Sequence, residues 1–241
     1  MWPVPLNRFG TAHPVANLHL LDNMFWHCLS GPHLHFSAGN QEARRYAQGL
    51  SPMIGFPDYE HPNFAALGPF CESGERFYSD RWSGPAPAGW RIEVEATMFK
   101  MYWSAAIPDE EDSRDFAALG PEHAEQAMEL ATLTKPGPFG LRTIELGEYF
   151  GYFEGGRLVA MAGERMCAPG LREISGVCTH PDFQGRGLAR RLMNKLARRQ
   201  LLRGETPFLN VMRSNEGAHR LYEKMGFEDY LESVVRVVSP L

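Results

Sequence analysis

A strand, a glycine-containing turn and a basic helix follow one another in the last third of the chain, and this arrangement most constrains the fold. Residues 171–179 have the pattern of a strand, 180–187 that of a turn, and 188–199 that of a helix. A helix entered through glycines leaves several backbone N–H groups without partners, and these donors favour a phosphate ligand at the positive end of the helix dipole. Gly185 and Gly187 also lack the Cβ atoms that would keep a pyrophosphate away from the backbone.

Two familiar phosphate-binding motifs do not fit this segment. The P-loop pattern G-x-x-x-x-G-K-[ST] is absent from the sequence. The dinucleotide fingerprint G-x-G-x-x-G requires a third glycine, and Arg190 stands at that position. That fingerprint also requires its glycines directly after the strand, whereas five residues beginning with His180 intervene here. A nicotinamide-dependent enzyme is therefore disfavoured.

The pattern that does fit consists of two linked motifs. The first is Gln184-x-x-Gly187-x-Ala189, and the second is N-x-x-A-x-x-L-Y-x-x-x-G-F, which runs from Asn215 to Phe227. Together they resemble the coenzyme-A-binding segment and the last helix of the GNAT superfamily of N-acyltransferases. The resemblance covers about residues 115–241, roughly half of the chain. Two motifs at the right separation are much more specific than one glycine motif.

The resemblance implies an α/β fold with a GNAT-like mixed, mostly antiparallel sheet flanked by helices. We expect residues 113–241 to form an acetyl-CoA-binding catalytic domain and residues 1–112 to form an α+β region of uncertain role. Between them, Pro108–Asp115 is charged and has no periodic apolar face. The first half would complete the fold, cover the acceptor site or mediate a homodimer. It could also be a degenerate copy of the second half, although no internal repeat demonstrates this.

The remaining elements are predicted from periodicity and from turn residues. Helices are expected at 24–29, 41–49 and 121–134. Strands are expected at 91–97, 116–119, 147–153, 157–166, 206–212 and 227–238, with a further strand or a continuation at 98–103. Strands that alternate with helices favour a mixed α/β sheet.

The resemblance also implies which residues hold the cofactor. The backbone of Val177 and Thr179 would pair with the pantetheine arm, and the Val177 N–H would face the thioester carbonyl as an oxyanion donor. The turn and the start of the helix would wrap the pyrophosphate. The full expected set is Val177, Cys178, Thr179, Gln184, Gly185, Arg186, Gly187, Leu188, Ala189, Asn210, Asn215 and Ala218.

Acyl transfer from a thioester to an amine requires a neutral amine and a proton donor for the departing thiolate. An alkylammonium has a pKa of about 10.4, so a base near the amine is useful. By position in the family pattern, Glu173 is the leading base, provided that partial burial raises its pKa. A surface glutamate on an alternating strand is the other interpretation, and Glu164 or a water molecule is the alternative base. Tyr222 is the expected acid, because a phenol stays protonated at neutral pH.

These expectations describe an acyltransferase that moves an acetyl group from acetyl-CoA to a primary amine by direct attack in a ternary complex. The alternative is a non-catalytic acyl-CoA-binding sensor or regulatory module. The acceptor would be a small-molecule or peptide amine, and its identity does not follow from the sequence.

Composition restricts the partners. The net charge of −5 divides into −6 for residues 1–115 and +1 for residues 116–241, so neither half is basic enough to indicate nucleic acid. The acidic first half could attract a cationic amine, but such a bias more often only keeps a protein soluble. No apolar run is long enough to predict a membrane span.

Cysteine and histidine spacing predicts neither a disulfide framework nor a metal site. The four cysteines form no C-x-x-C pair and are expected to be reduced thiols in a cytoplasmic protein. His33 and His35 lack a third ligand at a recognisable spacing, so a surface or core role is expected for both. His180 precedes Pro181 and is expected to be a turn residue.

Overall fold

One eight-stranded sheet organises the molecule. The structure is a computed structural model that describes residues 17–109 and 115–241. All neighbouring strands are antiparallel except β9 and β10, which run parallel. The expected mixed, mostly antiparallel sheet is therefore confirmed. In spatial order the strands are β4 (Phe77–Asp80), β11 (Phe227–Pro240), β5 (Trp90–Trp103), β10 (Thr206–Met212), β9 (Leu171–Thr179), β8 (Arg157–Ala168), β7 (Tyr149–Glu154) and β6 (Ala117–Ala118).

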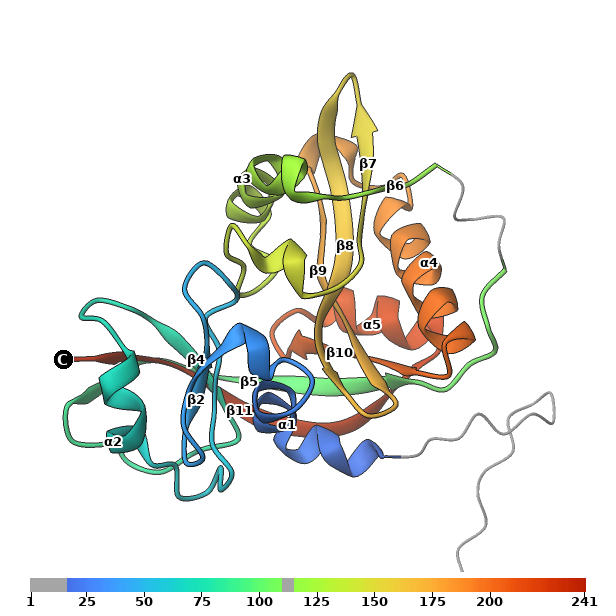
Figure 1. The fold of residues 1–241 in the computed structure, drawn as a ribbon. Coiled ribbons are helices and arrows are strands. Elements are labelled where there is room, and N and C mark those ends of the chain that lie inside the picture. The colour runs from blue at the N-terminus through green and yellow to red at the C-terminus, as the bar shows by residue number, and fades with distance from the viewer. Residues whose placement is uncertain (1–16, 110–114) are drawn as a thin grey trace, which may run out of the picture.

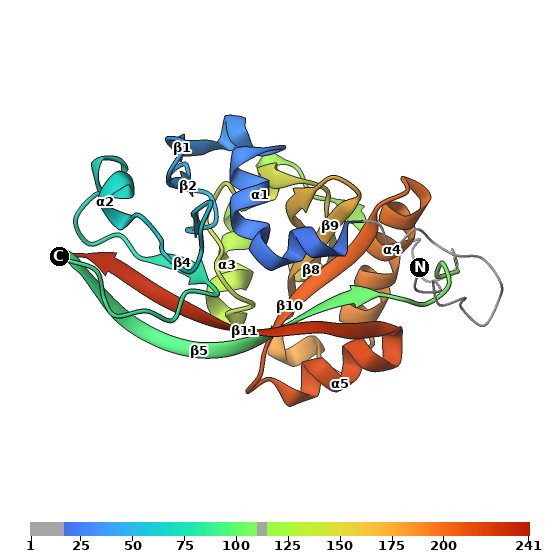
Figure 2. The same cartoon turned by 90° about the horizontal axis from the view of Figure 1, so that it is seen from below.

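Helices cover both faces of this sheet. On one face, α4 (Leu188–Leu202) and α5 (Glu216–Met225) share a core with β8, β9 and β10. On the other face, α1 (Met24–Ser30) packs against β8, and α3 (Ala124–Thr134) packs against β8 and β9. Figure 2 shows α1 and α5 on opposite sides of the long β5–β11 pair. The sheet is thus buried from both sides where β8, β9 and β10 meet.

The first half of the chain builds onto this sheet. It supplies β4 and β5, together with the helix α2 (Phe64–Leu67) and a small separate sheet of β1 (Ser37–Gly39), β2 (Arg44–Tyr46) and β3 (Ile54–Gly55). In Figure 1, α2, β2 and β4 lie toward the end of the main sheet where the C-terminus lies, and β5 extends from there along β11. The expected domain boundary between residues 112 and 113 lies outside the described residues. The degenerate-copy interpretation of the first half stays a prediction.

Short 3-10 helices connect many of these elements. They span Leu18–Asn23, Leu34–Phe36, Gly68–Phe70, Pro121–His123, Thr143–Leu146 and Pro181–Phe183. Among the described residues, no helix combines the length and the apolar character that a bilayer crossing needs.

The helix expected at residues 41–49 is wrong. Arg44–Tyr46 forms strand β2, which pairs with both β1 and β3. Arg45 is buried and donates to Glu75, and Tyr46 is also buried in the core. Helical periodicity was therefore outweighed by partners that lie far away in the sequence. The other elements expected from the sequence lie where they were predicted, to within a few residues.

A buried polar network attaches α1 and the small sheet to β8. His33 Nδ1 lies 2.8 Å from the Tyr46 hydroxyl, and His33 Nε2 lies 3.3 Å from the Cys167 thiol. Cys28 Sγ is 3.3 Å from the same hydroxyl. The ligand atoms of Cys28, His33 and Cys167 all lie within 4.8 Å of one another. His33 is 4% exposed and therefore lies in the core, one of the two positions expected for it, with a protein partner for each ring nitrogen.

A second buried network joins β4, β5 and β11. Lys100 on β5 is only 1% exposed, forms an ion pair with Asp80 on β4, and donates to the Leu21 carbonyl at 2.7 Å. Ser233 on β11 donates to Asp80 at 2.8 Å. A buried charge that lost its partner here would be costly, so these contacts hold the three strands in one arrangement.

Candidate active site

The strands β9 and β10 separate from each other at the centre of the sheet. Their parallel pairing covers only Thr206–Phe208 opposite Leu171–Glu173. Beyond these pairs, both strands line one cleft of about 370 Å³. The edge of β9 that faces β10 therefore carries backbone groups without strand partners, and such an edge can pair with an extended ligand.

A β-bulge shapes the β9 wall of this cleft. The register of β9 against β8 shifts between the pairs Met161–Cys178 and Gly163–Ser175. Gly176 lies in this shift with φ of +63°, where a side chain would be strained and would contact the Tyr149 ring at 3.3 Å. A glycine inside a strand is the sequence signal for such a bulge, and our sequence interpretation missed it. The bulge turns the backbone at Val177, which lines the cleft.

The glycine turn after β9 leads directly into α4. Gly185 and Gly187 have φ of +77° and +74°, and a Cβ built on either would meet no atom within 4 Å. Gly187 is the N-cap of α4, and no side chain caps the helix there. The first turn of α4 therefore has no side-chain cap and there is room beside both glycines, as an anion site requires. Leu188 is buried and anchors this end of the helix in the core.

The neighbouring turn residues are exposed. Arg186 lies 3.8 Å from Glu154 and 5.3 Å from the ring of Phe183, and Gln184 is also exposed. His180 accepts a bond from the Asp182 N–H and lies 3.0 Å from Arg157, so it holds the turn as expected. The contacts of His180 thus fix the beginning of the turn, whereas Gln184 and Arg186 are exposed.

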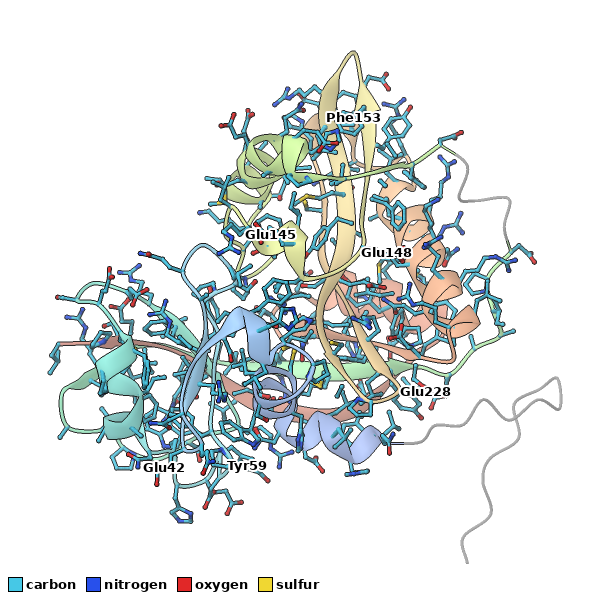
Figure 3. All side chains as sticks on the ribbon, viewed as in Figure 1. Glu42, Tyr59, Glu145, Glu148, Phe153 and Glu228 are labelled. Carbon is cyan, nitrogen blue, oxygen red and sulfur yellow. The ribbon has the colours of Figure 1, made fainter. Side chains whose placement is uncertain are left out.

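Several cations of α4 donate hydrogen bonds to neighbouring segments of the chain. Arg191 donates to Asp115 at 2.8 Å, and Arg198 donates to the Pro108 carbonyl at 2.9 Å. Arg199 donates to Glu148, which lies beside α4 in Figure 3. These contacts fasten the helix to the segments around it.

Tyr222 reaches the cleft from the face that α5 covers. It lines the same cavity as Val177, and its ring packs edge-on against Phe227 at 6.1 Å between ring centroids. Burial raises the pKa of Tyr222 to about 12. The Tyr222 hydroxyl therefore keeps its proton at neutral pH and can donate it to a basic atom of a ligand in the cleft.

Glu173 is more deeply buried than a catalytic base was expected to be. Its side chain is 1% exposed and does not line the cleft. Arg165 donates to both of its carboxylate oxygens, at 3.0 Å and 2.6 Å, and Asn210 Nδ2 donates at 2.8 Å. Neither the partial burial expected of a base nor the surface position of the other interpretation is therefore correct for Glu173. Arg165 and Asn210 do line the cleft and stand between the carboxylate and the cavity.

Glu164 lies away from the cleft. It is buried on β8 and accepts bonds from Gln200 and Arg203, and from the backbone N–H of Glu148. It does not line the cavity that contains Tyr222. These hydrogen bonds connect β8 to the end of α4. They do not give Glu164 access to a substrate in the cleft.

The other expected cofactor residues are distributed around the cleft and the helix ends. Asn210 lines the cavity, whereas Asn215 caps α5 by accepting from the Ala218 N–H at 3.2 Å. Cys178 is buried on the side covered by α3, and burial raises its pKa to about 11. Its thiol therefore points away from the cleft, and only its backbone could serve a cofactor. The hydroxyl of Thr179 is buried without a hydrogen-bond partner.

Comparisons with known proteins agree with this geometry. The family described as FR47-like protein matches residues 149–237. A crystal structure described as a putative acetyltransferase from the GNAT family of Novosphingobium aromaticivorans superposes with a TM-score of 0.85 at 32% identity, covering 92% of this chain and 99% of that chain. This chain belongs to the GNAT family.

Two further matches are shorter or less similar in sequence. The N-alpha-acetyltransferase RimI of Mycobacterium tuberculosis is 35% identical over 83 residues, which are 33% of this chain and 51% of that protein. The chain thus spans about half the length of this curated relative. A GCN5-related N-acetyltransferase-like protein from Streptococcus suis has a TM-score of 0.53 at 15% identity, with 98% of both chains covered, and shows the shared fold alone. Membership of the GNAT family supports acyl transfer as the general chemistry.

Proposed function

We propose that this GNAT protein is an N-acetyltransferase that moves the acetyl group of acetyl-CoA to a primary amine by direct attack in a ternary complex. The observation that carries this proposal is the separation of β9 from β10 in front of Tyr222, with the open N-terminus of α4 at the end of the same strand. The unpaired edge of β9 thus lies between a proton donor, Tyr222, and an anion site, the N-terminus of α4. An acyl thioester on a long diphosphate carrier requires these three features.

On this proposal, the donor extends along β9. The backbone of Val177 and Thr179 pairs with the pantetheine arm, and the Val177 N–H stabilises the oxyanion of the thioester. Gln184, Arg186 and the amides from Gly185 to Ala189 hold the pyrophosphate. Further contacts to the cofactor are proposed for the Cys178 backbone, Asn210, Asn215 and Ala218.

The proposed reaction requires a positioned amine as the nucleophile and Tyr222 as the proton donor. The amine nitrogen attacks the thioester carbon, the C–S bond breaks, and Tyr222 gives its proton to the departing sulfur. A phenol whose pKa burial has raised to about 12 remains available as the acid throughout the neutral range. The proton that the amine loses goes to water, and a proton from solvent restores the Tyr222 phenol.

We propose that Glu173 acts on the amine indirectly, by holding the Asn210 side chain in place. Glu173 accepts from Asn210 Nδ2, which leaves the Asn210 carbonyl oxygen as the free acceptor, and that oxygen has no partner among the described atoms. An amine N–H can donate to it. In this arrangement Glu173 is a positioning residue, whereas direct proton abstraction by Glu173 would need a water or a movement of Asn210.

The named activity of RimI, an N-alpha-acetyltransferase, favours an α-amino group as the acceptor of this chain as well. An α-amino group has a pKa of about 8, against about 10.4 for an alkylamine. More of it is neutral at pH 7, which suits a cleft that no aspartate or glutamate of the described residues lines. The cytoplasm is the proposed location, since all four cysteines are free thiols.

The alternative is an acyl-CoA sensor that binds without turnover. Incubating the protein with acetyl-CoA and a panel of amino acid amides separates the two. Free thiol release together with an acetylated amine in the mass spectrum is the result expected of the enzyme. Saturable acetyl-CoA binding with no product from any amine would favour the sensor.

A further inference from the structure

The acceptor side of the cleft has a distinct chemical character. On β5, Val94, Ala96 and Met98 alternate along the strand and therefore share one face. On β11, Val235 pairs with Ala96 and Val237 pairs with Val94. All five side chains line the cleft. We call this surface the β5–β11 floor. It is an apolar surface that begins near Asn210 at Met98, the strand partner of Met212, and runs along the cleft to Val94.

This floor is left partly open to solvent. Val94 is 52% exposed, which is unusual for a large apolar side chain beside a cavity. The nearby carboxylates of β5 point the other way, since Glu93 and Glu95 have the opposite parity along the strand. Glu93 is held by Arg76 at 2.6 Å, and Glu95 is held by Arg236 at 2.5 Å. The floor therefore offers contact area without negative charge.

The charged residues that line the cleft also provide no negative charge for a cationic acceptor. None of the described residues that line it is an aspartate or a glutamate. Arg165 lines the cleft but is paired with Glu173. Lys135 also lines the cleft, is exposed, and has no ion-pair partner in the described part of the chain. A second positive charge on the acceptor would thus meet a cation and an apolar surface, and no carboxylate.

One buried polar atom of a cleft-lining residue indicates where the amine lies. The carbonyl oxygen of Asn210 is buried without a partner, and Asn210 lines the cleft together with the floor and Tyr222. A buried acceptor without a partner is costly, and a ligand N–H would satisfy it. The amine end of the acceptor therefore belongs at Asn210, and its body belongs on the β5–β11 floor.

We infer that the acceptor is an amine with an apolar body and no second positive charge, held with its nitrogen at Asn210 and its body on the β5–β11 floor. This inference rests on the proposed function and adds the substrate class. The carboxylates that flank Val94 are turned away and ion-paired, so the acidic first half gives no reason to expect a multiply cationic acceptor here. Polyamines and multiply cationic acceptors are excluded as good substrates.

Three amides of matched size test the inference at saturating acetyl-CoA. L-norleucinamide has an apolar side chain, L-argininamide carries a second positive charge that cannot be acetylated, and L-citrullinamide is a neutral analogue of the latter. We expect kcat/KM for norleucinamide to exceed that for argininamide at least about tenfold, with citrullinamide between them. Wild-type protein that preferred argininamide would overturn the inference.

A charge placed on the floor should change this ranking. Ala96→Asp, at a cleft-lining position closer to Asn210 than Val94, is expected to lower the norleucinamide-to-argininamide ratio at least about tenfold, with the KM for acetyl-CoA unchanged. Leu202→Asp is the matched control, because Leu202 is 63% exposed on α4 and does not line the cleft. An equal loss with both amides, or no change in the ratio, would contradict the inference.

A binding measurement keeps the two proposals apart. Calorimetry of each amide against the protein saturated with coenzyme A reports acceptor preference without turnover. Norleucinamide should bind, and argininamide should bind more weakly or not at all. Equal or inverted binding overturns the substrate class alone. Failure to bind acetyl-CoA in the first place overturns the proposed function.

Discussion

The guanidinium of Arg165 on β8 holds the carboxylate of Glu173 on β9 with two bonds, at 3.0 Å and 2.6 Å. Both side chains are almost completely buried. The pair lies beneath the cleft, and Asn210 connects it to the cavity. Its effect is to fix the amide of Asn210 with the carbonyl oxygen free.

Breaking this pair should cost more than removing it. Glu173→Gln leaves a buried guanidinium without its counter-charge, and we expect a loss of about 3–5 kcal/mol of unfolding free energy. The double variant Arg165→Met/Glu173→Gln should recover part of that loss, since no charge is then buried alone. Urea unfolding of the wild type, both single variants and the double variant measures the coupling. Additive losses would contradict the account.

The same variants test the assignment of Glu173 as a positioning residue. A conservative Glu173→Asp that keeps the charge should retain part of the turnover if its contact with Asn210 re-forms. Asn210→Leu should raise the KM for the amine and leave the KM for acetyl-CoA unchanged. If Asn210→Leu were fully active while Glu173→Gln lost the basic limb of its pH–rate profile, Glu173 would be the base itself.

Tyr222→Phe removes the proposed acid and keeps the packing of the ring against Phe227. Turnover should fall by roughly 10- to 1000-fold, with little change in acetyl-CoA affinity. Burial raises the pKa of Tyr222 to about 12, so its acidic form persists as the pH rises and is lost only near that value. Activity measured up to pH 10 should therefore show no decline that belongs to Tyr222. Tyr152→Phe is the control, because Tyr152 is outside the cleft lining.

Gly187→Ala tests the pyrophosphate site against a matched glycine. Gly187 and Gly204 lie just before and beyond α4, have φ of +74° and +76°, and would both carry a Cβ in open space. Each substitution should cost about 1 kcal/mol of backbone strain. Only Gly187→Ala should also raise the Kd for acetyl-CoA, by about tenfold or more. Calorimetry on both variants decides this, and an equal effect on Kd would remove the turn from the donor site.

The position of β5 predicts how the chain can be divided. This strand precedes the expected boundary yet lies between β11 and β10 in the main sheet. A fragment of residues 104–241 should therefore lack cooperative thermal unfolding, whereas a fragment of residues 90–241 retains the strand. Circular dichroism melts compare the two. A cooperative melt from the shorter fragment would show that residues 113–241 are an independent domain.

The second half of the fold could be predicted because its signals are local. The helices α4 and α5 follow from apolar periodicity, from the glycine that begins α4 and from the Asn215 cap of α5. The strand β10 and the β7–β8 hairpin follow from alternation and from a glycine turn. Both halves of the GNAT pattern lie in these segments.

The rest depends on partners far apart in the sequence. Arg45 became part of a strand because Glu75, thirty residues later, holds it. The environment of Glu173 depends on Arg165 from a neighbouring strand, and alternation along β9 cannot reveal that contact. The β5–β11 floor exists only because Val94 and Val237 are paired. No local pattern encodes such contacts.

Calorimetric titration of acetyl-CoA into the purified protein tests the central claim most directly. We predict saturable binding with one molecule of acetyl-CoA per chain, weakened by Gly187→Ala and unaffected by Gly204→Ala. No heat and no saturation at millimolar acetyl-CoA would contradict the account.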